Sequence, residues 1–84
     1  MEVSVLGAGY VGLVQAAGLA STGNDVYLAD ISQEKIDLLN QGVCPIFEPG
    51  LTELLQKGRE KKYLNYFNAA SAEFFEKMKA SDII

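Results

Sequence analysis

Short apolar runs alternate along the chain with longer stretches in which apolar residues recur every three or four positions. The runs Val3–Leu6 and Val26–Ala29 contain β-branched residues and end at Gly7 and Asp30. Continuous apolar runs of this length, bounded by turn or polar residues, predict buried strands. Strands of this kind are typical of a parallel sheet, because helices cover such a sheet on both faces.

Two helices are predicted next to these strands. The first runs from Tyr10 to about Ser21 and ends before the Gly23-Asn24 pair. Its apolar positions are Val11, Val14, Ala17 and Ala20. The second begins after Ser32, a favoured N-cap residue, and closes at Gly42. Its apolar positions are Ile36, Leu39 and Val43.

The middle of the chain departs from this alternation. Pro45 and Pro49 favour an extended backbone over Val43–Pro49, and Pro49 is expected in the first turn of a short helix. The apolar positions of that helix are Leu51, Leu54 and Leu55. Gly58 is expected to stop it, which makes the basic segment Lys57–Lys62 a solvated connection.

One more strand and helix follow. Tyr66–Ala69 is a strand candidate, and a helix starts at Ser71, with Phe74, Phe75 and Met78 on its core face. The segment 82–84 begins another buried strand. The alternation predicts an α/β fold, a Rossmann-like doubly wound parallel sheet (βαβαβαβ). Because the fourth strand only begins at the last residues, we expect residues 1–84 to be one partial, truncated domain, the N-terminal fragment of a longer protein.

Composition restricts the class of function. A hydrophobic fraction of 49% with 21% charged residues is typical of a globular chain, and the net charge of −4 argues against nucleic acid or an anionic membrane as a partner. There is no histidine, which removes the commonest metal ligand, and we expect no metal site. The single cysteine, Cys44, cannot form a disulfide within the chain, so we expect a cytoplasmic location and an inert, packed thiol.

The first turn carries the spacing Gly7-x-Gly9-x-x-Gly12. A turn between a strand and a helix directs backbone N–H groups and the positive helix end toward an anion. Gly7 would permit the sharp turn, Gly9 would let the backbone approach a pyrophosphate, and Gly12 would let the helix lie close to the strand. The pattern therefore predicts a dinucleotide site, although such turns also occur for steric reasons alone.

Asp30 indicates which dinucleotide is the cofactor. It ends the second predicted strand, where a carboxylate can accept hydrogen bonds from the adenosine ribose and repels a 2′-phosphate, so NAD is favoured over NADP. Lys35 lies on the first turn of the next helix and could offset the charge of Asp30. The alternative is an empty or flavodoxin-like turn with Asp30 and Lys35 exposed to solvent.

Several segments together resemble the UDP-glucose 6-dehydrogenase family, which forms one group with the GDP-mannose and UDP-N-acetylmannosamine dehydrogenases. The segments are "GAGYVGL" at Gly7–Leu13, "EKIDLLNQG" at Glu34–Gly42 and "PIFEPGLTELL" at Pro45–Leu55. The last one distinguishes the family from other Rossmann proteins. The resemblance covers essentially the whole chain, which departs from the family at Gly23-Asn24, where members often carry Gly-His.

The resemblance implies a nucleotide-sugar 6-dehydrogenase that oxidises the C6 alcohol to a carboxylate with two NAD, with UDP-glucose as the first expected substrate. It implies that the cofactor-binding residues are Gly7, Gly9, Tyr10, Val11, Gly12, Asp30 and Lys35. Glu48, Pro49 and Gly50 match a loop that shapes the region near the cofactor. No catalytic residue is expected within residues 1–84, so the fragment itself should be inactive, and the full-length protein is expected to be a homo-oligomer.

Other classes remain open at this stage. GDP-mannose or UDP-N-acetylmannosamine dehydrogenases share the same motifs. A regulatory nucleotide-binding module of the kind that gates potassium transporters shares the glycine turn and the acidic strand end, but has no reason to contain Pro45–Leu55. A 6-phosphogluconate- or hydroxyacyl-CoA-type dehydrogenase would need a different segment after the second helix.

Overall fold

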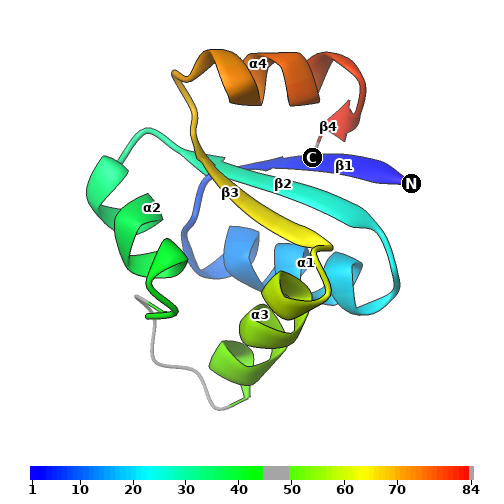
Figure 1. The fold of residues 1–84 in the computed structure, drawn as a ribbon, viewed down its shortest axis with the longest axis vertical. Coiled ribbons are helices and arrows are strands. Elements are labelled where there is room, and N and C mark those ends of the chain that lie inside the picture. The colour runs from blue at the N-terminus through cyan, green and yellow to red at the C-terminus, as the bar shows by residue number, and fades with distance from the viewer. Residues whose placement is uncertain (45–49, 84) are drawn as a thin grey trace.

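The computed structural model describes residues 1–44 and 50–83, which form one parallel sheet with helices on both faces (Figure 1). The described strands are β1 (Glu2–Leu6), β2 (Asp25–Asp30), β3 (Leu64–Asn68) and β4 (Asp82–Ile83). The described helices are α1 (Tyr10–Ser21), α2 (Gln33–Asn40), α3 (Leu51–Glu60) and α4 (Ala72–Lys79). The α/β fold with a doubly wound parallel sheet is confirmed.

The strands are ordered β3-β2-β1-β4. β2 pairs with β1 along the length of β1, from Glu2 opposite Asp25 to Leu6 opposite Ala29, while β4 pairs only with Val3 and Ser4. The chain moves outward from β1 to β3 and then returns to the other side of β1. Ligands of doubly wound sheets bind at the carboxyl ends of the strands, where the strand order reverses, which is next to β1.

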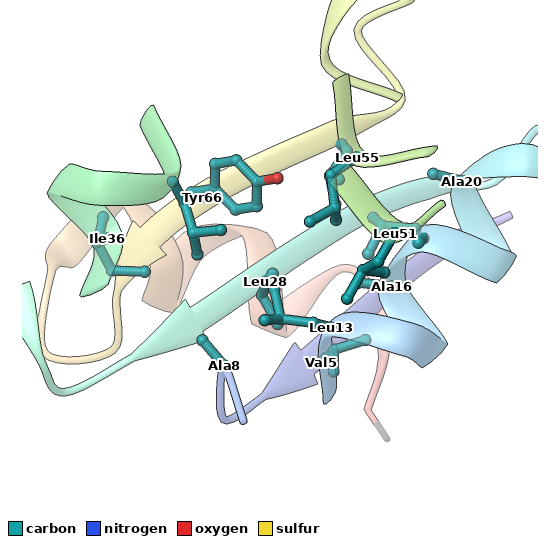
Figure 2. Close-up of a cluster of buried hydrophobic side chains, with 14 of the residues drawn as sticks. Val5, Ala8, Leu13, Ala16, Ala20, Leu28, Ile36, Leu51, Leu55 and Tyr66 are labelled. Atoms are coloured by element: carbon teal, nitrogen blue, oxygen red, sulfur yellow. The ribbon is translucent and has the colours of Figure 1, made fainter. Parts of the chain in front are cut away.

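The larger hydrophobic core lies between the sheet and α1, α2 and α3 (Figure 1). Figure 2 shows side chains of all three helices meeting those of β1, β2 and β3. The fully buried members from the strands and α1 are Val3, Val5, Leu13, Ala16, Ala17, Val26, Leu28 and Leu64. Alternate residues of each strand point into this core, so the sequence period of two becomes one covered face.

The opposite face of the sheet is covered by α4 (Figure 1). Phe74 inserts from α4 and packs with Tyr27 and Ala29 of β2, and its ring centroid lies 6.2 Å from that of Phe67. Leu6, on this side of β1, remains 49% exposed. In the described part of the chain, no helix is long and apolar enough to cross a membrane.

The helix ends follow the predicted capping residues. Ser32 accepts a hydrogen bond from the N–H of Lys35, and Ser71 accepts one from the N–H of Phe74, so both serines are N-caps. Gly42 has a positive φ of 85° after α2, and its N–H donates to the carbonyl of Leu39. This is the left-handed helix end that glycine permits without strain.

The prediction that Gly58 ends its helix is wrong. α3 continues to Glu60, and Gly58 is buried inside it, where an added Cβ would lie 3.1 Å from Leu64 Cβ and 3.3 Å from Ala20 Cβ. Glycine at this position lets α3 approach α1 and β3 closely, which is a packing role that sequence spacing does not separate from a stop. Most of Lys57–Lys62 therefore belongs to the last turn of α3 and not to a connection.

The predicted apolar face of α1 is also partly wrong. Val11 and Val14 are 65% and 41% exposed. The buried positions are Leu13, Ala16, Ala17 and Ala20. The two sets differ because a strict three-residue step drifts around a helix of 3.6 residues per turn, whereas steps of three and four stay on one face.

Other positions are also more exposed than predicted, among them Leu54 of α3, which is 44% exposed. Val43 follows α2 and is 47% exposed, and Phe75 is 46% exposed on α4, beside the buried Phe74. Asp82 and Ile83 of β4 are exposed, so this strand is not buried in the described chain. β3 begins two residues before the predicted Tyr66. The predictions for Pro45 and Glu48 and for the first-turn position of Pro49 lie outside the described residues.

Candidate cofactor site

The glycine turn leads directly from β1 into α1. Gly7 adopts a φ of +98°, which glycine reaches without strain, and its N–H donates to the carbonyl of Ala29 at 2.8 Å. Gly9 is the N-cap of α1, and its carbonyl accepts the N–H of Leu13 at 2.9 Å. The turn therefore uses only residues 7–9 to change from strand to helix.

Gly12 is required by the close approach of α1 to the turn. An added Cβ would lie 1.8 Å from the carbonyl oxygen of Gly7 and 3.0 Å from its carbonyl carbon. An added Cβ at Gly9 would meet no atom within 4 Å. The two glycines are thus needed for different reasons. A side chain at position 12 would clash with the backbone of Gly7, whereas the lack of a side chain at Gly9 leaves open space above the turn.

The N-terminus of α1 has the properties of an anion site. No side chain of residues 1–44 or 50–83 caps it, and its first turn contains no acidic residue. The first N–H groups of a helix have no partner within the helix, and they carry the positive end of its dipole. Tyr10 and Val11 are 51% and 65% exposed, so this end of the helix is open to a ligand.

Asp30 ends β2 beside this turn. Its Oδ2 accepts the N–H of Ala8 at 2.8 Å, and its Oδ1 accepts the N–H of Ser32 at 2.8 Å. These two hydrogen bonds, with a smaller contribution from the positive charge of Lys35, lower the pKa of the Asp30 carboxyl below its usual value. The side chain is therefore ionised at neutral pH.

Lys35 lies in the first turn of α2 and is partly buried. Its backbone N–H donates a hydrogen bond to the N-cap hydroxyl of Ser32. The positive charge of its ammonium group lowers the pKa of Asp30. The predicted residues from Gly7 to Gly12, Asp30 and Lys35 thus gather at one edge of the sheet. Their roles toward a cofactor remain the prediction made from the sequence.

Sequence reasoning missed the backbone amides of Ala8 and Ser32. Both donate to Asp30, and Ala8 lies 22 positions before it in the chain. A local signal existed for Ser32, because Asp side chains often bond the amide two residues later. No sequence pattern pointed to Ala8, since that contact depends on the pairing of β1 with β2.

Of the remaining candidate residues, the structure describes Cys44 and Gly50. Cys44 is partly buried and packs against the larger core. Gly50 precedes α3 with a φ of +84°, while Glu48 and Pro49 lie outside the described residues. Across residues 1–44 and 50–83, no group of three or more His, Cys, Asp or Glu side chains is arranged to hold a metal ion.

Comparison with known proteins identifies the family. Residues 1–84 match the UDP-glucose/GDP-mannose dehydrogenase family, NAD binding domain. The chain belongs to this family. The resemblance predicted from the glycine turn and the Pro45–Leu55 segment is thereby confirmed, and NAD is the cofactor of the matched domain.

Two relatives illustrate the range of named activities in the family. GDP-mannose 6-dehydrogenase of Pseudomonas savastanoi pv. phaseolicola is 47% identical over 83 residues, which cover 99% of this chain and 18% of that protein. UDP-glucose 6-dehydrogenase YwqF of Bacillus subtilis (strain 168) is 46% identical over 66 residues, which cover 79% of this chain and 15% of that protein. The chain therefore spans less than a fifth of the length of these relatives.

Solved structures of the family share the fold. The ternary complex of GDP-mannose dehydrogenase from Pseudomonas aeruginosa superposes with a TM-score of 0.85 at 42% identity, covering 100% of this chain and 19% of that one. UDP-glucose dehydrogenase from Pyrobaculum islandicum superposes with a TM-score of 0.83 at 39% identity, covering 98% and 19%. The family fold is thus present in this chain.

Proposed function

We propose that this chain binds the ADP half of NAD for a nucleotide-sugar 6-dehydrogenase. The pyrophosphate would lie against the N–H groups of Tyr10, Val11 and Gly12, above the open side of Gly9. The observation that carries this proposal is the bond between Asp30 and the amide of Ala8, because it joins an ionised carboxylate to the open helix end. In a bound dinucleotide the ribose would contact the carboxylate and the diphosphate would contact the helix end, so the two groups must lie side by side.

The ionised carboxylate of Asp30 favours NAD over NADP. It can accept hydrogen bonds from the ribose hydroxyls, and it would repel a 2′-phosphate placed in the same position. Lys35 reduces the repulsion between Asp30 and the pyrophosphate, since its positive charge already acts on Asp30. Bound NAD would supply hydride acceptance for alcohol oxidation, while the residues of this chain bind and orient its adenosine end.

The nucleotide sugar is a finer proposal. UDP-glucose is the substrate expected from the sequence, and relatives named for it match this chain. GDP-mannose is the alternative substrate, and relatives named for it match over more of the chain than the UDP-glucose relative does. In either case the sugar would contact polypeptide outside residues 1–84. A homo-oligomeric enzyme with the nucleotide sugar as its small-molecule partner remains part of this proposal.

Titration calorimetry with NAD and NADP tests the cofactor part. NAD should bind at least about tenfold more tightly, because NADP would place a phosphate beside Asp30. Equal affinities would contradict the assignment of Asp30. The substrate part is tested by NADH formation with UDP-glucose and with GDP-mannose, using a protein of the relatives' length, while residues 1–84 alone should form no NADH.

A further inference from the structure

The carboxylate of Asp30 accepts hydrogen bonds from two other segments of the chain. Oδ2 accepts the N–H of Ala8, in the glycine turn, and Oδ1 accepts the N–H of Ser32, at the start of α2. Ala8 is fully buried. A buried backbone N–H is costly when it has no acceptor, and Asp30 is the acceptor that this amide has.

The other hydrogen bonds of the turn do not replace this one. The N–H of Gly7 donates to Ala29 and extends the β1–β2 pairing by one residue. The carbonyl of Gly9 accepts the N–H of Leu13 and begins α1. Ala8 lies between these two bonds, and its amide is where a described side chain, that of Asp30, bonds the turn.

The geometry points to a second role for Asp30, as a positioning residue that fixes the glycine turn through the Ala8 amide before a cofactor is present. The identity of the ligand that benefits rests on the proposed function, but the contact itself does not. A carboxylate offers about four acceptor positions. Two are used by Ala8 and Ser32, which leaves the others for ribose hydroxyls, so both roles fit on one side chain.

The charge of Asp30 strengthens this arrangement. Hydrogen bonds from backbone amides to an ionised carboxylate are shorter and stronger than those between neutral groups. The positive charge of Lys35 acts on Asp30 from α2 and favours the same ionised form. The glycine turn is therefore held by the ionised carboxylate of Asp30, which lies at the end of the neighbouring strand β2.

Amide hydrogen exchange, resolved by NMR on the isotopically labelled chain, tests the role without a cofactor. In Asp30→Ala, exchange at Ala8 should accelerate at least about tenfold, the factor that the loss of one charge-assisted hydrogen bond represents. Gly7, bonded to Ala29, should keep its protection. Asp25→Ala removes a carboxylate from the other end of β2 and should leave Ala8 unchanged. Unchanged exchange at Ala8 in Asp30→Ala would overturn the role.

A second measurement uses the unsubstituted chain, so it does not depend on a variant that folds. The amide proton resonances of Ala8 and Ser32 should shift together as Asp30 is protonated, with a midpoint below the usual carboxyl range. Resonances that do not titrate together would overturn the role. Asp30→Asn, which keeps the size of the side chain, should abolish this shared titration.

The two proposals can fail separately. If the chain binds no NAD but Ala8 and Ser32 titrate with Asp30, the positioning role stands and the proposed function fails. If Asp30→Ala weakens NAD binding while Ala8 keeps its protection, the ribose contact stands and the positioning role is refuted.

Discussion

Alanine substitutions at Gly9 and Gly12 should have separate effects, one on cofactor binding and the other on the stability of the fold. In Gly12→Ala the new Cβ would lie 1.8 Å from the carbonyl oxygen of Gly7, a backbone atom that cannot turn away as a side-chain end could. Overpacking of this kind costs about 1–3 kcal/mol, and a rigid contact favours the upper end. A domain of this size is stabilised by about 4–13 kcal/mol, so the loss is large.

The assay is thermal unfolding of three variants followed by circular dichroism. Gly12→Ala should lower the melting temperature by roughly 10–25 °C, because about 1 kcal/mol corresponds to about 4–8 °C in a domain of this length. Gly18→Ala is the matched control in the same helix, where the added Cβ meets nothing within 4 Å, and it should stabilise the fold by about 0.5–1 kcal/mol.

Gly9→Ala should have the opposite profile. The backbone of Gly9 has a φ of −78°, which any residue adopts, and the added Cβ would lie more than 4 Å from every atom of the described residues other than its chain neighbours. Alanine is a poorer N-cap than glycine, so the melting temperature should fall by only a few degrees, well short of the loss in Gly12→Ala. NAD affinity should fall at least about tenfold, equivalent to about 1.4 kcal/mol. The reasoning would be refuted if Gly9→Ala destabilised the fold as much as Gly12→Ala, or if it bound NAD normally.

Three other substitutions give independent tests. Asp30→Ala should weaken NAD binding by about 1.5–3 kcal/mol for each ribose hydrogen bond lost, measured by titration calorimetry, and an unchanged affinity would remove Asp30 from the site. Since the folded pKa of Asp30 is lowered, its stabilising effect is present above the unfolded value of 3.8 and is lost as pH falls through the folded value. Urea unfolding should therefore show Asp30→Asn clearly less stable at pH 7, with a gap that shrinks in acid; a constant gap would argue against the charged bonds. Ser71→Ala removes the N-cap of α4 and should cost about 1 kcal/mol in the same assay, whereas Ser21→Ala, at an exposed helix end, should cost less.

Much of the fold was predictable because local signals agreed with one another. The apolar runs of β1 and β2, the serine N-caps and the left-handed Gly42 each depend on a few neighbouring residues. The sequence did not reveal the role of Gly58, because glycine is needed there to make room for Ala20 and Leu64. Ala20 is distant in the chain, and Leu64 lies beyond the helix. A glycine that admits a neighbouring element and a glycine that ends a helix look alike in sequence.

The site was predictable to a different degree. The spacing along the sequence was enough to predict that the glycine turn and Asp30 belong to one site, because the carboxyl ends of parallel strands lie at the same edge of the sheet. The hydrogen bond to Ala8 was not predictable, because it requires the exact register in which Leu6 lies opposite Ala29. Residue type indicates what a side chain can do, but the pairing register decides which amide it meets.

The position of β1 in the sheet has a consequence for the order of folding. Among the described strands, β1 comes first in the chain. Its pairing with β2 closes a short segment, whereas its other neighbour, β4, comes from residues 82–83. Contacts between distant parts of a chain are slow to form, because a long loop must be ordered first. We therefore expect β1, α1 and β2 to associate early and the β1–β4 pairing to form last. In stopped-flow kinetics, Ser81→Ala, which removes the hydroxyl partner of Ser4, should speed unfolding and leave the folding rate almost unchanged. Until the β1–β4 pairing forms, β1 is paired with β2 alone among the described strands.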